Sequence, residues 1–160
     1  MRVIKEWSVF KKDCDFILTK KLVYILEFTP RIGGNSISKL IKSSCGFDII
    51  EYSIREACGV YNILHEKNEE KPRAILILGV PSEGKLSYNI DEYEKLKLEP
   101  WVVHLSITKK NGDSVKPFMN GRLSIGEALI LGKNRIDLEK NAFDVYKRLC
   151  LNTESWIKSQ

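Results

Sequence analysis

The sequence is poor in the residues and segments that mark several protein classes. It has two histidines and four cysteines, and no two cysteines are spaced as C-x-x-C, so neither a zinc site nor a disulfide framework is indicated. We interpret Cys14, Cys45, Cys58 and Cys150 as thiols of a reduced, cytoplasmic protein. No apolar run approaches the ~20 residues that span a bilayer, and the first residues lack the apolar segment of a signal peptide.

A separate block of one charge is also missing. The net charge is +5, but lysines and arginines are interleaved with acids, as in residues 66–71 and 91–95. Because no aromatic ladder accompanies a basic block, we expect a solvated surface of mixed charge and no nucleic-acid partner. A hydrophobic content of 43% is enough for a folded core, so the 160 residues are not expected to be disordered.

The most informative segment is residues 15–34, which predict a β-hairpin with one acid on each strand. A three-residue loop at residues 20–22 would place Asp15 opposite Glu27, and would also pair Ile17 with Ile25 and Thr19 with Val23. Two carboxylates that face each other on one sheet surface repel each other. A hard divalent cation with oxygen ligands would relieve that repulsion, so the pair indicates a metal site.

Two short helices are predicted after the Gly33-Gly34 link. Asn35 or Ser36 would cap the first helix and Gly46 would end it. Asp48 would cap the second helix, with Glu51 three residues later, and Gly59 would end it. The residues expected on the apolar faces are Ile37, Leu40 and Ile41 in the first helix, and Phe47, Ile50, Ile54 and Cys58 along the second.

A change in composition predicts a boundary near residues 60–72, followed by a region rich in strands. Strands are expected at residues 74–78, 85–88, 102–108 and 129–131, with Asn111-Gly112 as a hairpin signal; residues 3–10 are also strand-like. A late helix is expected over residues 137–149, capped by Asp137. Its buried face would consist of Leu138, Ala142, Val145 and Leu149.

Residues 24–42 and the following Cys45-Gly-Phe-Asp-Ile-Ile50 resemble the end of an ATP-grasp catalytic domain, in the carboxylase-like and amino-acid-ligase branch. In that family an acid on one strand is followed twelve residues later by a Glu-x-Asn-x-Arg motif, then by a glycine-rich turn and two helices. Asp15, Glu27 and Arg31 keep this spacing, whereas Thr29 stands at the Asn position. The resemblance implies an α+β fold: the C-terminal portion of an ATP-grasp domain in residues 1–59, then a small antiparallel cap with a terminal helix in residues 60–160.

The resemblance also implies roles for individual residues. Asp15, Glu27 and Thr29 would hold Mg²⁺ or Mn²⁺ together with ATP, and Arg31 would act on the transferred phosphate or the substrate. The carboxylate end of the substrate would lie at Gly33, Gly34 and Asn35. Thr29 is a shorter, neutral donor than the usual Asn, so the number of bound metal ions stays open.

The activity implied by the family is an ATP-dependent ligation of a small carboxylic acid to an amine through an acyl phosphate. A carbamoyl-phosphate-synthase or biotin-carboxylase type of reaction stays an alternative, as does a non-catalytic binding or assembly module, which Thr29 favours. Residues 1–14 cannot supply the Lys, glycine-rich loop and adenine-binding hinge of the family. We therefore expect the chain to act with N-terminal lobes from the same or a split enzyme, and not to turn over ATP alone. A homodimer also stays open.

Two further patterns have simpler interpretations. Residues 79–85 fit G-x-x-x-x-G-K, but Leu86 replaces the Ser or Thr of a P-loop, so we predict a turn between two strands. His104 lies in an apolar strand and is predicted to be a packed or edge histidine, not a partner of Cys58 in a hydrolase.

Overall fold

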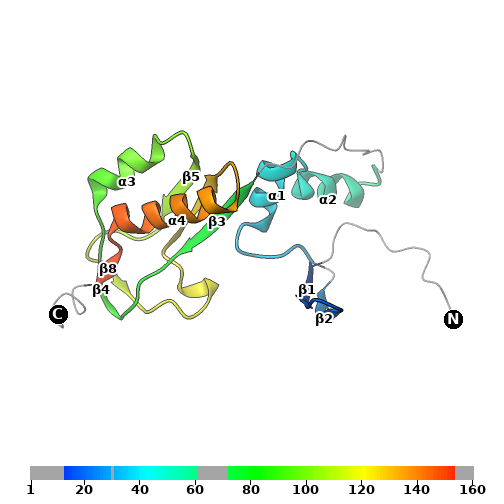
Figure 1. The fold of residues 1–160 in the computed structure, drawn as a ribbon, viewed down its shortest axis with the longest axis horizontal. Helices are drawn as coiled ribbons and strands as arrows, with labels where there is room; N and C mark the ends of the chain where they lie inside the picture. The colour runs from blue at the N-terminus through cyan, green and yellow to red at the C-terminus, as the bar shows by residue number, and fades with distance from the viewer. Residues whose placement is uncertain (1–12, 30, 61–71, 154–160) are drawn as a thin grey trace. The chain divides into compact units, whose positions relative to one another are not determined.

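The computed structural model describes residues 13–29, 31–60 and 72–153. The chain forms two compact units, Met1–Asn68 and Glu69–Gln160, and each is described by itself (Figure 1). The predictions for residues 3–10, Pro30 and most of the 60–72 boundary lie outside the described residues. The mixture of antiparallel strands and helices confirms the predicted α+β class.

The first unit begins with a hairpin of β1 (Asp13–Leu18) and β2 (Val23–Thr29). Asp15 faces Glu27, as predicted, but the other two predicted pairs are wrong. Ile17 pairs with Tyr24 and Leu18 pairs with Val23, because the register shifts by one residue after Asp15.

The Thr19 hydroxyl explains the different loop. It accepts hydrogen bonds from the backbone N–H groups of Lys21 and Leu22, while the Thr19 N–H donates to the Leu22 carbonyl at 2.9 Å. A Ser or Thr side chain stabilises a tight turn in this way. The loop is therefore four residues long, and the irregularity between Asp15 and the next residue of β1 restores the carboxylate pair.

Two helices, α1 (Ile37–Cys45) and α2 (Ile49–Ala57), complete the described part of the first unit. Ser36 precedes α1, but its φ of 59° is left-handed and its side chain makes no capping hydrogen bond, so the predicted cap is wrong. The caps of α2 and the end of α1 are confirmed: Asp48 accepts from the N–H groups of Ile50 and Glu51, and Gly46 has a φ of 77°.

The predicted burial along α2 is wrong. Ile50 and Ile54 are 49% and 60% exposed, and Cys58 is also exposed. The α2 sequence is amphipathic, but no described residue of α1 or α2 is fully buried. The apolar face is present in the sequence, whereas the surface that would cover it is not among the described residues of this unit.

The second unit has an antiparallel sheet of order β3-β7-β5, made of β3 (Arg73–Leu78), β7 (Gly126–Leu131) and β5 (Val102–Ile107). Helices α3 (Ile90–Lys97) and α4 (Arg135–Leu149) pack on each other and on this sheet (Figure 1). A second small sheet has the order β6-β4-β8, with β6 (Ser114–Val115), β4 (Gly84–Ser87) and β8 (Asn152–Thr153), and η1 (Gly121–Leu123) is a short 3₁₀ helix. The core is apolar and includes Leu78, Leu96, Ile130, Val145 and Leu149.

The predicted buried face of the late helix is confirmed, whereas the predicted first residue of this helix is wrong. Val145 and Leu149 are fully buried, and Leu138 and Ala142 pack on the same core. However, α4 begins two residues earlier, because Asn134 is the cap and its side chain accepts from the Asp137 N–H at 3.0 Å. Asp137 accepts instead from the Lys133 N–H at 3.0 Å.

The two glycine patterns that the sequence analysis singled out in this unit both contain turns. Residues 79–83 connect β3 to β4, and Lys85 lies within strand β4 and not at the start of a helix, so the turn interpretation of the G-x-x-x-x-G-K pattern is confirmed. Asn111-Gly112 also forms a turn, but its flanking strands β5 and β6 pair in different sheets. The predicted hairpin is therefore wrong.

Candidate functional site

Four side chains of the first unit line one small cavity: Asp15, Glu27, Thr29 and Arg31. Its formation follows from the hairpin. Glu27 and Thr29 are two residues apart on β2, so they point to the same face, and the register places Asp15 of β1 directly opposite Glu27. Arg31 follows the end of β2 and lines the same cavity. The structure thus brings together the four residues predicted for metal binding and phosphate transfer.

The two carboxylates and the guanidinium that line this cavity do not pair with each other. No ion pair joins Arg31 to Asp15 or Glu27 among the described residues. Two carboxylates and one guanidinium carry a net charge of about −1, which favours a bound cation. The carboxylate oxygens and the guanidinium N–H groups thus all stay available to a ligand.

The Thr29 hydroxyl is the most informative atom of the cavity. It is buried and has no hydrogen-bond partner among the described residues. A buried polar atom without a hydrogen-bond partner lowers the stability of the fold. A cation coordinated by the Thr29 hydroxyl oxygen would satisfy this atom. Two carboxylates and a hydroxyl form the all-oxygen set that Mg²⁺ and Mn²⁺ prefer. The cavity volume of about 20 Å³ is enough for one water-sized particle.

The three residues predicted to bind the substrate do not line this cavity. Gly33, Gly34 and Asn35 form the turn between Arg31 and α1, and the Gly34 carbonyl accepts from the Ile37 N–H at 3.2 Å. Asn35 has a left-handed φ of 50°, directly before the left-handed Ser36. A Cβ on Gly34 would meet no atom within 4 Å, so open space surrounds this position.

No protein-family model and no curated protein matches the sequence. Solved structures do match, over 89% of the chain. They include an L-amino acid ligase from Bacillus licheniformis (TM-score 0.74, 18% identity, 36% of that chain covered) and a phosphoribosylglycinamide synthetase from Anaerococcus prevotii (0.68, 18%, 37%). A third is an N5-carboxyaminoimidazole ribonucleotide synthetase from Thermotoga maritima (0.60, 19%, 37%).

All three are ATP-grasp ligases. The chain has the fold of the C-terminal part of an ATP-grasp ligase. The resemblance predicted from residues 24–50 is therefore confirmed at the level of the fold. The chain spans a little over a third of the length of these ATP-grasp structures.

Among the residues that the structure describes, no group of three or more His, Cys, Asp or Glu side chains could hold a metal ion. His104 lies on the edge strand β5, with its Nε2 3.8 Å from Glu127 Oε1, as predicted for an edge histidine. In the described part of the chain, no helix is long and apolar enough to cross a membrane.

A larger cavity in the second unit was not predicted. It has a volume of about 660 Å³ and lies between the end of β3 and the C-terminal end of α4. Burial in its wall raises the pKa of the Tyr146 phenol. The lining residues come from three separate parts of the chain, residues 77–81, 118 and 146–152, so local sequence patterns could not reveal the cavity. The available signal was Tyr146, an aromatic residue of α4 that lies outside the predicted apolar face.

Proposed function

We propose that this chain supplies the metal- and substrate-facing part of an ATP-dependent ligase that joins a carboxylic acid to an amine through an acyl phosphate. The observation that carries the proposal is the cavity lined by Asp15, Glu27, Thr29 and Arg31, with an unpartnered hydroxyl in its wall. Further support comes from the fold, because the similar solved structures are named as a ligase and two synthetases. Residues 1–59 would end the catalytic domain, and residues 60–160 would form the cap.

Asp15, Glu27 and Thr29 would hold one Mg²⁺ or Mn²⁺ ion, since the donors are all oxygen and the volume suits a single ion. A divalent cation supplies charge neutralisation for the phosphates of ATP. Thr29 contributes no charge, so the two carboxylates would provide the electrostatic attraction and the hydroxyl would fix the position of the ion.

Arg31 would stabilise the phosphoryl group during its transfer from ATP to the substrate carboxylate. In this step the carboxylate oxygen forms a bond to the γ-phosphorus, and the bond from that phosphorus to the ADP oxygen breaks. The amine then attacks the acyl carbon and inorganic phosphate leaves. A planar guanidinium can hold two phosphate oxygens at once, which a lysine cannot. The backbone of Gly33, Gly34 and Asn35 would meet the carboxylate end of the substrate.

The nucleotide-binding lobes of the ATP-grasp fold would be the partner of this chain. The matched structures are about 2.4 times as long, since 89% of this chain covers 36–37% of theirs, so we expect no ATP turnover by the 160-residue chain alone. ATP hydrolysis by the purified chain would contradict this expectation.

Thermal unfolding with Mg²⁺ and ATP tests the proposed site. A ligand that binds only the folded state raises the melting temperature. We expect a rise for the wild type, no rise for Glu27→Gln, and a smaller rise for Arg31→Lys, which keeps the charge but loses the planar fork. Glu51→Gln is the matched control, since Glu51 is an exposed carboxylate of the same unit that pairs with Arg55. Equal rises in the wild type and Glu27→Gln would refute the site.

A further inference from the structure

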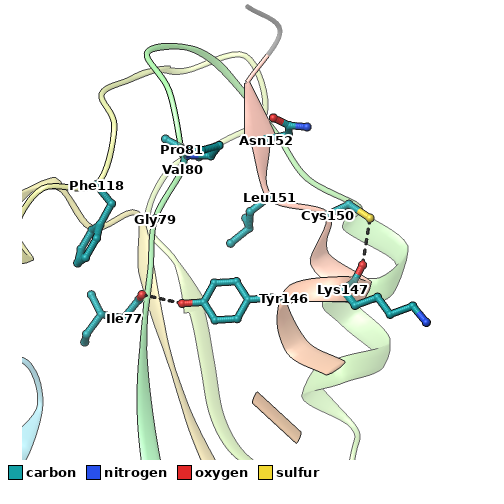
Figure 2. Close-up of a pocket in the computed structure, with 10 residues that line it drawn as sticks. All are labelled: Ile77, Gly79, Val80, Pro81, Phe118, Tyr146, Lys147, Cys150, Leu151 and Asn152. Atoms are coloured by element: carbon teal, nitrogen blue, oxygen red, sulfur yellow. Dashed lines mark hydrogen bonds between the residues drawn. The ribbon is translucent and has the colours of Figure 1, made fainter. Parts of the chain in front are cut away.

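The large cavity of the second unit is a preformed site with aromatic walls (Figure 2). Its volume of about 660 Å³ lies within the range of small-molecule sites, roughly 300–1,000 Å³. Apolar side chains make up most of the lining: Ile77, Val80, Pro81, Phe118, Tyr146 and Leu151. This composition favours a ligand with an apolar body.

Two hydrogen bonds and one glycine fix the aromatic walls. The Tyr146 hydroxyl donates to the Ile77 carbonyl at 3.0 Å, which joins α4 to β3 (Figure 2). The Phe118 N–H donates to the Val80 carbonyl at 2.9 Å. Gly79 lets the Phe118 ring approach, because a Cβ at Gly79 would lie 2.5 Å from Phe118 Cβ. The cavity therefore needs little rearrangement to accept a ligand.

Several hydrogen-bond acceptors around the cavity already accept a hydrogen bond within the protein. Besides the carbonyls of Ile77 and Val80, the Lys147 carbonyl accepts from the Cys150 thiol at 3.0 Å (Figure 2). The Asn152 side-chain oxygen accepts from the Thr153 N–H at 2.9 Å.

The donors are free. Neither the Lys147 ammonium nor the Asn152 side-chain nitrogen has a hydrogen-bond partner among the described residues, and no Asp or Glu lines the cavity. Figure 2 shows the Lys147 side chain extending from α4 in the direction away from the Tyr146 ring, and Lys147 is the one charged residue among those that line the cavity. Long lysine side chains can place their stem along apolar surface and move the charged end across a cavity mouth.

We propose that this cavity binds a small organic anion, with an aromatic or branched aliphatic body against Phe118, Tyr146 and Leu151 and a carboxylate held by Lys147 and Asn152. The unpartnered ammonium of Lys147 and the lack of a lining Asp or Glu favour an anion over a neutral amide or an amine. The site belongs to the second unit and does not depend on the proposed ligase activity.

Nuclear magnetic resonance of the ¹⁵N-labelled full chain tests the proposal with three probes of one shape: 3-phenylpropionate, 3-phenylpropionamide and 3-phenylpropylamine. We expect 3-phenylpropionate to shift the backbone amide signals of Gly79, Cys150 and Asn152. It should bind about tenfold more tightly than the neutral amide, because a hydrogen bond to a charged group is stronger than one between neutral groups. The amine should bind most weakly.

Matched variants separate the two parts of the site. Lys147→Gln should lower the affinity for 3-phenylpropionate to that for the amide and leave the amide affinity unchanged. Lys140→Gln, an exposed lysine of α4 that does not line the cavity, should change neither. Phe118→Ala should lower the affinity for all three probes. The dispersion of the amide signals shows whether each variant is folded.

Equal affinities for the three probes, or an affinity of Lys147→Gln equal to that of the wild type, would overturn the proposal. Shifts confined to the first unit would do the same. A much tighter fit for the tripeptide Gly-Gly-Phe would reassign the site to the C-terminus of a protein partner. None of these variants alters Asp15, Glu27, Thr29 or Arg31, so the outcome is independent of the ligase proposal.

Discussion

Gly126 is the position at which the packing leaves least room for a side chain. A Cβ there would lie 2.1 Å from the Ser106 carbonyl oxygen and 2.9 Å from Ile107 Cα, both in the neighbouring strand β5. Neither contact can be relieved by rotating a side chain, since both partners are backbone atoms. The close approach of β5 and β7 therefore requires glycine at this point.

We predict that Gly126→Ala lowers the free energy of unfolding by at least about 1–3 kcal/mol, the usual cost of an overpacked core. Gly34→Ala is the control, because its Cβ would meet open space and its φ is not left-handed. It should change stability by no more than about 0.5 kcal/mol. Urea unfolding followed by circular dichroism measures both; an equal effect of the two substitutions would contradict the prediction.

At the residue scale, the sequence predicted the facing pair but not the details that surround it. Asp15 and Glu27 were found because alternation along a strand is a local property. The register beyond them was wrong, because the Thr19 hydroxyl favours a four-residue turn. The burial of the Thr29 hydroxyl could not be predicted, since it depends on side chains from both strands and from Arg31.

The start of α4 shows how neighbouring polar residues compete for one capping role. Asn134 and Asp137 both have side chains suited to a helix N-terminus. The structure uses them together: Asn134 accepts from the Asp137 N–H, and Asp137 accepts from the Lys133 N–H. The sequence predicted the existence and buried face of this helix correctly but chose the wrong cap.

We predict that Asn134→Ala lowers the free energy of unfolding by about 1 kcal/mol, the typical cost of losing a cap. Asn134→Asp keeps an oxygen acceptor at the same place and should retain nearly all of the stability. Thermal unfolding of the two variants beside the wild type measures the difference. Equal melting temperatures for Asn134→Ala and Asn134→Asp would show that the side-chain cap contributes nothing to stability.

Helix α3 was missed, although its signals are present. Asn89 caps it, Asp91 and Glu92 occupy its first turn, and Lys95 and Lys97 its last. This distribution of charge complements the helix dipole. We interpreted these residues only as surface charge, because few apolar residues accompany them. Arg148 of α4 contacts Glu92 of α3 and Glu99, which follows the end of α3, each at 2.6 Å.

The contacts of Glu92 predict a dependence of stability on pH. Hydrogen bonds from Lys95 and then Arg148 lower the pKa of the Glu92 carboxyl below its ordinary value of 4.5. A lowered pKa in the folded state means that the contribution is complete above the unfolded pKa and is lost as the pH falls through the folded value. Glu92→Gln should therefore lose less stability on acidification from pH 6 to pH 3 than the wild type.

Thermal unfolding across that pH range gives the comparison. Lys95→Gln is the graded control, because it removes the larger cause and leaves Arg148 in place. It should lie between the wild type and Glu92→Gln. Identical slopes for all three proteins would show that the Glu92 contacts do not contribute to acid stability.

At the scale of the whole molecule, the two units differ in how they bury apolar side chains. The second unit has a closed core, whereas no described residue of the first unit is fully buried. In the hairpin, Leu18, Ile25 and Leu26 are 72%, 67% and 63% exposed. Strands that are apolar on both faces are typical of sheets covered on both sides. The matched structures extend well beyond the part that this chain covers, and we propose that such a further part supplies this cover.

The sequence predicted the fold because the motif of residues 24–50 is continuous in the chain, and its elements follow each other directly. The sheet order β3-β7-β5 was beyond reach, because residues 73–78 pair with residues 126–131 across the rest of the unit. The large cavity of the second unit was not predicted for the same reason, since β3, α4 and β8 meet there only after folding. Local chemistry can be predicted from such a sequence, and distant pairing cannot.

The central claim is that Asp15, Glu27 and Thr29 form the site of one divalent cation. Electron paramagnetic resonance of Mn²⁺ titrated into the full chain tests it most directly, since bound and free Mn²⁺ give different signals. We predict one ion per chain for the wild type and the control Glu51→Gln, weaker binding for Thr29→Val, and loss of binding for Glu27→Gln. Equal binding of Mn²⁺ by the wild type and Glu27→Gln would contradict the account.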